Sequence, residues 1–414
     1  MPTHRPPGLS TRGSALVDAP ALPAYLAEHF ARSAEPYDEH ARPDGYIPMC
    51  IAENRLVWDL IEPKVSGDRA VTPDALGYFD MVGPAGFRAD LASFLGRRVF
   101  GRPVAPEHIA VLAGAGSILE TLFYLLADPG EGVLIPTPSY AGFWMDLEVR
   151  DALRVLPVHT NASDGFRLTP ALLDDALDRA DCPVRVLLFT TPNNPMGTVY
   201  SEAELRGILD WAESRGIHVV FDEIYALSVF GDRPFTSTAT LRESLGDHVH
   251  LVWAFSKDFA ASGLRCGVLV SENAGVLAGM GALSYWACCS GDTLHLLRSW
   301  VTDDAWLDRY LPEMRRRLGA AHDTVCTALS AAGIPVVPGG AGFFVLVDLR
   351  AHLDRPDWES EDRLWRRILD EANVNLTPGV AIRSAEPGLF RLCFASVSPT
   401  ALAAGLARLV RVLS

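Results

Sequence analysis

Short apolar runs separated by amphipathic segments constrain the fold of this chain more than any other feature. The runs HIAVLAG, GVLIP, VRVLLFTTP, HVVFDE, HLVWAFS and RCGVLVSE have the length and composition of buried strands. Between them lie helical patterns such as LTPALLDDALDRA and SEAELRGILDWAESRG; in the second, Ser201 and Glu204 have the spacing of a capping box. This alternation favours a mostly parallel sheet with helices on both faces, in which ligands bind at the carboxyl ends of the strands.

The pattern changes after about residue 300. A long charged helix over 303–333 is followed by a strand pair, IPVVP and GFFVLVDLR, by two more helices and by the strand FRLCFASV. We expect a smaller α+β domain at 301–414, a large domain at 71–300, and an N-terminal tail and arm at 1–70 that contributes to the small domain. The N-terminus, MPTHRPPGLSTRGSALVDAP, predicts a flexible tail and neither a signal peptide nor a membrane anchor.

Composition excludes several classes of partner. The net charge is -15 and no block of basic residues occurs, so nucleic acid and anionic membranes are poor partners. The most apolar stretch, 274–289, is too short and too broken to span a bilayer. The seven cysteines form no CxxC pair and have no histidines at metal-binding spacing, which predicts free thiols in a reducing cytoplasm and no metal site.

Four segments place polar residues at the ends of apolar strands. They are TPNNPMGT, FDEIY, FSKDFAASGLRCG and FRLCF, which carry Asn194, Asp222, Lys257, Arg265 and Arg391. Each residue alone has an ordinary structural interpretation, such as a helix cap, a solvated lysine or half of an ion pair. Together they are the set that a pyridoxal 5'-phosphate (PLP) site requires, because that cofactor needs an imine-forming lysine, an acid at its ring nitrogen, phosphate ligands and an arginine for the substrate carboxylate.

The order and spacing of these motifs resemble the fold type I, class I/II aminotransferase superfamily, and within it the 1-aminocyclopropane-1-carboxylate (ACC) synthases. The similarity runs from about residue 45 to the C-terminus and includes IPMCIAENRLVWDLIE, IPTPSYAGFWMDLEVR, FSKDFAASGLRCGVL and LTPGVAIRSAEPGLFRLCFA. It implies an α/β fold with a mostly parallel seven-stranded sheet, helices on both faces and a smaller α+β domain. It also implies that 71–300 is the PLP-binding domain.

The resemblance implies roles for individual residues. Lys257 is the imine lysine and the base that moves the α-proton of the substrate, and Asp222 partners the pyridine nitrogen. Asn194 and Tyr225 hydrogen-bond the phenolic oxygen, and Tyr140 stacks on the ring. Asp222 and Tyr225 count with Lys257 as catalytic, and Tyr140 and Asn194 also line the substrate site.

The remaining implied roles concern the cofactor phosphate and the substrate carboxylate. The phosphate group is expected to bind Arg265, Ala115, Gly116 and Ser117, with Ser256 beside the imine lysine. Arg391 is expected to clamp the substrate carboxylate, and Asn194-Pro195 to be a cis peptide bond.

Glu53, in the AEN segment, connects the chain to one substrate. In the ACC synthase pattern this glutamate lies near the substrate and favours S-adenosylmethionine (SAM), whose sulfonium is a cation. The ordinary structural interpretation is a surface or helix-capping glutamate.

Three positions depart from the family pattern around the phosphate. Met81 stands where the family has a tyrosine in a loop that reaches into the partner subunit, although Tyr78 lies close by. Ala254 replaces a serine, and Gly116 replaces a threonine with Ser117 one step along. Each lost hydroxyl or phenol weakens phosphate binding by about 1 to 3 kcal/mol, and the changes leave more room beside the phosphate.

The leading functional hypothesis is α-deprotonation of SAM, γ-elimination of methylthioadenosine and ring closure to ACC. The alternatives are trapping of the vinylglycine-like intermediate by a second substrate with C–C bond formation, an aminotransferase, and a non-catalytic PLP-binding regulator. The last is disfavoured because only about 45 residues precede the similarity, with no helix-turn-helix pattern. We expect a cytoplasmic homodimer whose site is completed by the partner's loop near 78–83 and the segment around Thr293.

Overall fold

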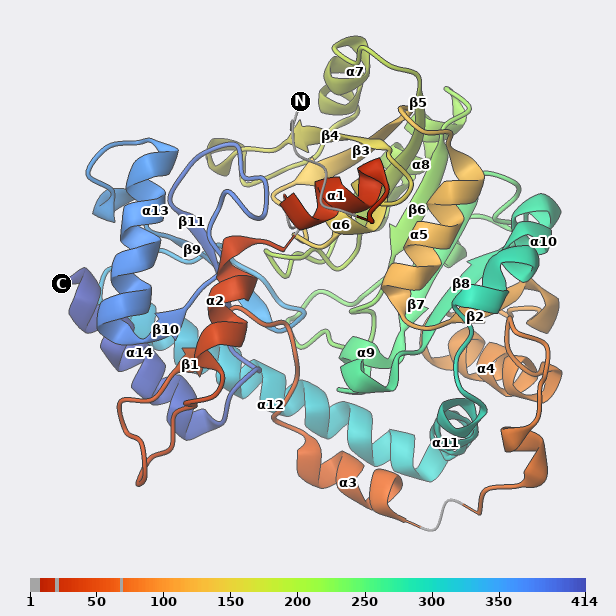
Figure 1. Cartoon of the computed structure of the whole chain (residues 1–414), viewed down its shortest axis with the longest axis horizontal. Helices are drawn as coiled ribbons and strands as arrows, with labels where there is room; N and C mark the ends of the chain where they lie inside the picture. The colour runs from red at the N-terminus through yellow and green to blue at the C-terminus, as the bar shows by residue number, and fades with distance from the viewer. Residues whose placement is uncertain (1–7, 19–21, 68–69) are drawn as a thin grey trace.

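One sheet forms the centre of the molecule (Figure 1). The computed structural model describes residues 8–18, 22–67 and 70–414. In spatial order the strands are β2 (Ile109–Leu112), β8 (Gly267–Ser271), β7 (Val249–Ala254), β6 (His218–Asp222), β5 (Val184–Thr190), β3 (Gly132–Thr137) and β4 (Arg154–His159). Strand β8 runs antiparallel to both neighbours and the other pairs are parallel. The predicted mostly parallel seven-stranded sheet is confirmed.

Strand β4 was not among the six apolar runs that the sequence indicated. It lies at the end of the sheet, where it pairs only with β3, and several of its side chains are at least partly exposed. Its sequence, RVLPVH, includes Pro157, a residue that strands tolerate at an edge. An edge strand is buried on fewer sides, so its apolar pattern is weaker.

Helices cover both faces of the sheet because the strands are apolar on both faces. Leu187 and Phe189 of β5 pack in one core cluster with helix α8, whereas Val186 and Leu188 pack in a second cluster with helix α5. The helices around the sheet are α4 (Ala85–Arg98), α5 (Ala115–Leu126), α6 (Phe143–Glu148), α7 (Pro170–Asp178), α8 (Glu202–Glu213), α9 (Phe255–Asp258), α10 (Ala274–Leu283) and α11 (Gly291–Val301). The expected capping box is present at α8, where the Ser201 hydroxyl accepts from the Glu204 N–H at 3.3 Å.

The smaller α+β domain lies beside this sheet (Figure 1). It contains α12 (Asp304–Ala331), β9 (Phe344–Asp348), α13 (Trp358–Arg367), β10 (Val374–Asn375), β11 (Leu389–Cys393) and α14 (Pro399–Leu413). Strands β9 and β11 are antiparallel neighbours. The prediction that IPVVP is a strand was wrong, because this segment makes only one bridge, between Val336 and Val347.

The N-terminal arm joins the small domain through a short parallel pair, in which Ile47 of β1 (Ile47–Pro48) pairs with Val374 of β10. The arm also carries α2 (Ala24–Arg32) and α3 (Trp58–Ser66). The domain boundaries at 70 and 300 stay a prediction.

Part of the expected flexible tail is helical. Residues 1–7 and 19–20 of this stretch lie outside the described residues, but Thr11–Asp18 form helix α1, so the prediction of a flexible tail was wrong for this segment. The Ser10 hydroxyl accepts from the Gly13 N–H at 3.1 Å, which satisfies a backbone donor at the start of the helix. In the described part of the chain no helix is long and apolar enough to cross a membrane.

Single turns of helix complete the chain. They are η1 (Pro73–Leu76), η2 (Pro106–His108), η3 (Ala162–Asp164), η4 (Thr238–Leu241), η5 (Ser262–Leu264), η6 (Ser284–Trp286), η7 (Arg350–His352) and the π-helical η8 (Ile368–Ala372).

Candidate active site

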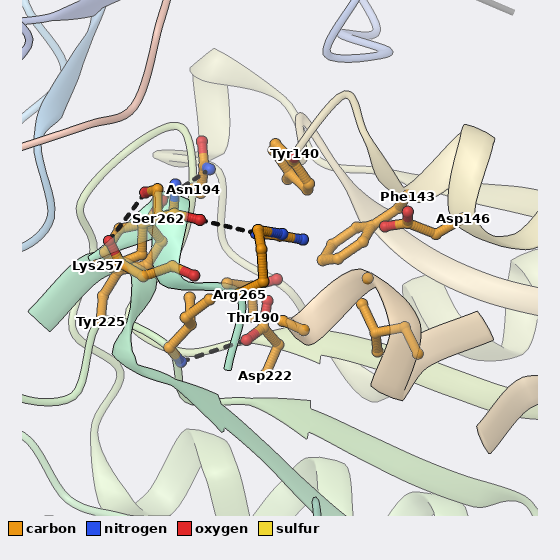
Figure 2. A pocket seen from close by; sticks show the side chains of 15 residues that line it. Tyr140, Phe143, Asp146, Thr190, Asn194, Asp222, Tyr225, Lys257, Ser262 and Arg265 are labelled. Carbon is orange, nitrogen blue, oxygen red and sulfur yellow. Dashed lines mark hydrogen bonds between the residues drawn. The ribbon is translucent and has the colours of Figure 1, made fainter. Parts of the chain in front are cut away.

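A cavity of about 760 Å³ opens where β3, β5, β6 and β7 end. It is lined by Ala115, Gly116, Leu119, Tyr140, Phe143, Asp146, Thr190, Asn194, Asp222, Ile224, Tyr225, Ser256, Lys257, Ser262 and Arg265 (Figure 2). Parallel strands deliver their following loops to one edge, which is why residues far apart in the sequence meet here. Nine of the predicted site residues line this cavity, and Ser117, Arg391 and Glu53 lie outside its lining.

Lys257 lies on α9, the short helix that follows β7. Its Nζ donates to the Ala52 carbonyl at 2.6 Å, a contact between segments 205 residues apart. Burial and the positive charge of Arg391 lower the pKa of Lys257 to about 8, while the negative charge of Glu53 opposes the shift. A neutral amine, the form that attacks a carbonyl, is therefore accessible near neutral pH. Lys64, which is partly buried in an ion pair with Asp303, is the only other lysine of the chain.

Asp222 ends strand β6 and is buried. Its Oδ1 accepts from the Ile224 N–H at 3.2 Å. Burial raises the pKa of Asp222 to about 7, and the charge of Lys257 opposes this rise. A cation placed beside this carboxyl would favour its ionised form, which is the role expected at a protonated ring nitrogen.

Asn194, Tyr225 and Arg391 form one buried network. The Asn194 Nδ2 donates to the Tyr225 hydroxyl at 3.3 Å, and the Arg391 Nη1 donates to the Asn194 Oδ1 at 3.1 Å. The Arg391 Nη2 donates to the Cys50 carbonyl at 2.7 Å and to the Thr377 hydroxyl at 3.1 Å. The Arg391 Nε has no partner in the described part of the chain. Arg391 thus adjoins the cavity through Asn194 and retains a donor for a ligand.

The opposite end of the cavity is built on the first turn of α5. Gly114 has φ 97° and precedes the helix, and a side chain there would collide with the Arg265 guanidinium. Arg265 donates to the carbonyls of Ser262 and Ala113 at 3.0 and 3.5 Å. The Ser117 hydroxyl donates at 3.2 Å to the carbonyl of Ala113, which precedes Gly114, and Ser117 is not among the residues that line the cavity.

The three positions that depart from the family pattern differ in how close they lie to the cavity. Gly116 lines the cavity and Ala254 is buried at the end of β7. Met81 is partly buried and Tyr78 is fully exposed, and neither lines this cavity. The expected cis peptide bond at Asn194-Pro195 is present.

Glu53 lies next to Ala52, the acceptor of Lys257, and lines an adjoining cavity of about 1090 Å³. That cavity is mostly apolar and shares Ser262 with the first one. Its walls include Trp58 of α3 and Trp300 of α11. The Glu53 carboxylate lies 3.5 Å from the Arg55 guanidinium.

Seven residues at the site were not predicted: Tyr25, and the six lining residues Leu119, Phe143, Asp146, Thr190, Ile224 and Ser262. Ser262 and Asp146 line the first cavity, and both fall within segments that carry the family resemblance. Tyr25, on α2, is buried near Arg391. Burial raises the pKa of the Tyr25 phenol, and the positive charge of Arg391 opposes this rise. No motif marks Tyr25, since only the fold brings α2 to the site.

These residues fit PLP by their chemistry. The cavity combines an amine of lowered pKa, a buried acid, an aromatic ring, an asparagine–tyrosine pair, and a helix N-terminus beside an arginine. A helix N-terminus with an arginine is suited to a phosphate group. A side chain at position 114 would collide with the Arg265 guanidinium, so the glycine is what allows Arg265 to lie beside this end of the cavity.

Comparison with known proteins agrees with this geometry. Residues 55–409 match the aminotransferase class I and II family. The chain belongs to that family. This family member is 37% identical to 1-aminocyclopropane-1-carboxylate synthase 4 of Oryza sativa subsp. japonica, over 94% of this chain and 86% of that protein. It is 36% identical to 1-aminocyclopropane-1-carboxylate synthase 7 of Arabidopsis thaliana, over 93% of this chain and 91% of that protein.

Solved structures show the same fold. The aspartate aminotransferase from Thermus thermophilus with maleate has a TM-score of 0.80 at 23% identity, covering 98% of this chain and 99% of that one. The aromatic aminotransferase from Pyrococcus horikoshii OT3 has a TM-score of 0.78 at 21% identity, covering 94% of this chain and 98% of that one. The chain is a PLP-dependent enzyme of the ACC synthase type within the class I and II aminotransferases.

Proposed function

We propose that this enzyme acts on SAM, removing the α-proton, eliminating methylthioadenosine from the γ-carbon and closing a cyclopropane ring. The names of its relatives support this product. The structural observation that carries the proposal is the position of Glu53. This residue follows Ala52, whose carbonyl accepts from the Lys257 Nζ, and it lines the adjoining apolar cavity.

The cofactor would be held by the residues at the ends of the strands. Lys257 would anchor it, Asp222 would face its ring nitrogen, and Asn194 and Tyr225 would face its phenolic oxygen. Arg265 and the first turn of α5 would bind its phosphate. When bound, PLP supplies an electron sink that makes the Cα–H bond of an amino acid acidic.

The protein's own groups then determine what happens to the substrate. Arg391 orients the carboxylate through its planar fork, since its Nε is unpaired in the described part of the chain. Lys257 takes the α-proton as a neutral amine, which its pKa of about 8 makes available. Tyr140, which lines the cavity, would stack on the ring of the cofactor.

Glu53 selects for a cationic side chain. A carboxylate about 4 Å from a sulfonium gains on the order of 4 kcal/mol at an effective dielectric near 20, before desolvation. The adjoining cavity would take the adenosyl group, because Trp58 offers a ring that is 57% exposed. In the described part of the chain the Asn54 Nδ2 and the Trp300 Nε1 lack partners, and both residues line this cavity.

We also propose a cytoplasmic homodimer. All seven cysteines are free thiols, as a reducing compartment favours. Leu76, at the end of η1, is 79% exposed, and Tyr78, in the loop after it, is 101% exposed; Tyr285 and Trp286 of η6 are 67% and 75% exposed. Large exposed apolar side chains of this kind favour an interface with a second copy, with Thr293 near its edge.

The test is product analysis of the holoenzyme with SAM. We expect stoichiometric methylthioadenosine and ACC, measured by liquid chromatography and mass spectrometry. Methylthioadenosine without ACC, together with a larger amino acid, would indicate trapping by a second substrate. A keto acid without methylthioadenosine would indicate an aminotransferase, and no turnover of any amino acid would indicate a regulator.

A matched substitution tests the role of Glu53. Glu53→Gln preserves the shape of the side chain and removes its charge. We expect it to weaken binding of SAM about tenfold or more, while binding of the uncharged S-adenosylhomocysteine changes little. Equal losses for the two ligands would contradict selection by charge.

A further inference from the structure

Asp146 is a carboxyl that the proposed chemistry does not use, although it lines the cofactor cavity. It lies on α6 and shares the lining with Gly116 and Arg265 (Figure 2). Among the described residues its side chain makes no hydrogen bond or ion pair, and Arg265 and Glu120 act on it only through their charges. The residue is only partly buried and lines the cavity, so a ligand that fills the cavity would displace its water and become its hydrogen-bond partner.

The position of Asp146 is tied to the missing side chain at residue 116. A Cβ added at Gly116 would lie 3.3 Å from the Asp146 Oδ1. The carboxyl therefore stands next to the space that a side chain at position 116 would enter, on the first turn of α5. This is the turn whose backbone N–H groups face the phosphate end of the cavity.

The surroundings of Asp146 favour its neutral form. Burial raises the pKa of Asp146 to about 7; the positive charge of Arg265 opposes this rise and the negative charge of Glu120 adds to it. Tyr140 and Asp222 also face the group, since each feels its charge. A phosphate dianion brought beside Asp146 would favour the protonated acid further, because like charges disfavour ionisation.

We propose that Asp146 binds the cofactor phosphate as a neutral acid, with its carboxyl O–H donating to a phosphate oxygen where residue 116 supplies no side chain. A carboxylic acid that burial keeps neutral can serve as a hydrogen-bond donor, and donation to an anion is a strong, short bond. When the carboxyl is ionised before binding, one proton is taken from solvent as the cofactor enters. Cofactor affinity is thereby linked to pH through this one side chain.

The sign of the linkage follows from which form binds. Below a pH of about 7 the free protein already carries the proton on Asp146, so binding needs no uptake. Above that pH the proton must be acquired, and this contribution raises the dissociation constant of the wild-type protein, relative to a variant that does not titrate at position 146, by up to about tenfold per pH unit. Asp146→Asn keeps a donor of similar shape that does not titrate, so it removes this contribution.

The experiment measures the PLP dissociation constant of the apoenzyme between pH 6 and 9, for the wild type and for Asp146→Asn. We expect the two proteins to have similar dissociation constants near pH 6. Above pH 7 the dissociation constant of the wild type, divided by that of the variant, should increase by up to about tenfold per pH unit. Titration of Lys257 and of free PLP affects both proteins equally and cancels in the ratio. Parallel curves across the whole range would overturn the proposal.

Asp151→Asn is the matched control. Asp151 is buried, its pKa is also raised to about 7 by burial and by Glu120, and it does not line the cofactor cavity. For this variant we expect the PLP dissociation constant to depend on pH as it does in the wild type. A flattened curve for Asp151→Asn would mean that any buried carboxyl near α6 produces the effect, which would overturn the assignment to Asp146.

A loss and a rescue sharpen the result. Asp146→Leu removes the donor and is expected to weaken PLP binding about 10- to 150-fold even at pH 6. The pair Gly116→Thr with Asp146→Ala exchanges the carboxyl for a hydroxyl and is expected to restore tight binding without the pH dependence. Tight binding by the leucine variant would overturn the proposal.

One measurement needs no variant. An infrared difference spectrum of the wild-type protein with and without PLP at pH 8 should show a protonated carboxyl band that appears on binding. Its absence would overturn the proposal even if the substitutions prevented folding. None of these measurements uses SAM, so they stand or fall independently of the proposed substrate.

Discussion

The two ends of the cofactor cavity differ in how completely the protein satisfies its own polar groups. At the lysine end, Asn194 bridges Tyr225 and Arg391, and the Lys257 amine donates to Ala52. At the phosphate end, Arg265 contacts only two carbonyls, and the Asp146 carboxyl lacks a hydrogen bond within the described residues.

This difference teaches that the catalytic groups are organised before the cofactor arrives, whereas the phosphate groups await it. Side chains that their neighbours already hold in place need no reorganisation at the moment of reaction. Unpaired ones gain their partners only on binding. Changes at the lysine end should therefore act on turnover, and changes at the phosphate end on cofactor retention.

The largest effect is expected at Lys257. Lys257→Ala should lower turnover of the amino-acid substrate by at least about 10⁴-fold, because the cavity loses both its amine and its base. Reduction of the holoenzyme with borohydride and peptide mapping should place PLP on this residue. Lys64→Ala, which changes the only other lysine, should retain activity; an adduct on Lys64 would contradict the assignment.

Arg391→Lys should have the next largest effect. An ammonium cannot make the two parallel bonds of the guanidinium fork, so kcat/KM should fall about 10²- to 10³-fold. The absorbance of the bound cofactor should remain, since Arg391 lies outside the cavity lining. If the variant lost PLP but showed an unchanged kcat/KM after reconstitution, the claim that the lysine end acts on turnover and the phosphate end on cofactor retention would be wrong.

At the phosphate end, Arg265→Gln should raise the PLP dissociation constant about 10- to 150-fold, the range for a lost charged hydrogen bond. At saturating PLP, kcat should return to within about threefold of the wild type. Equilibrium titration and steady-state kinetics on the same preparation separate the two quantities. A permanent loss of kcat would show that this end also orients the reacting groups.

The pH dependence of cofactor capture should show the smallest effect. The rate at which apoenzyme captures PLP should rise about tenfold per unit as pH increases toward about 8, the pKa of Lys257, and then level off, because the neutral amine reacts. Glu53 raises this pKa, so Glu53→Gln should shift the plateau to lower pH. Stopped-flow absorbance measures both profiles, and a shift to higher pH would contradict the electrostatic role of Glu53.

The sequence by itself determined the sheet and most of the cavity. Apolar runs of strand length between helical patterns predicted the architecture, because a chain must bury such runs on both faces. The motifs around Asn194, Asp222, Lys257 and Arg265 were recognisable because each is local, with its polar residue next to a strand end.

Only the tertiary structure decided how distant segments complete the site. The contact of Lys257 with Ala52, the link from Arg391 to Asn194, and the burial of Tyr25 join segments that have no periodic relation in the sequence. The edge strand β4 and the helix α1 were missed because each is only partly buried and carries a weak apolar pattern. Electrostatic states were also undecided by the sequence, since burial sets whether Asp146 and Asp222 carry a charge, and burial is a property of the packed chain.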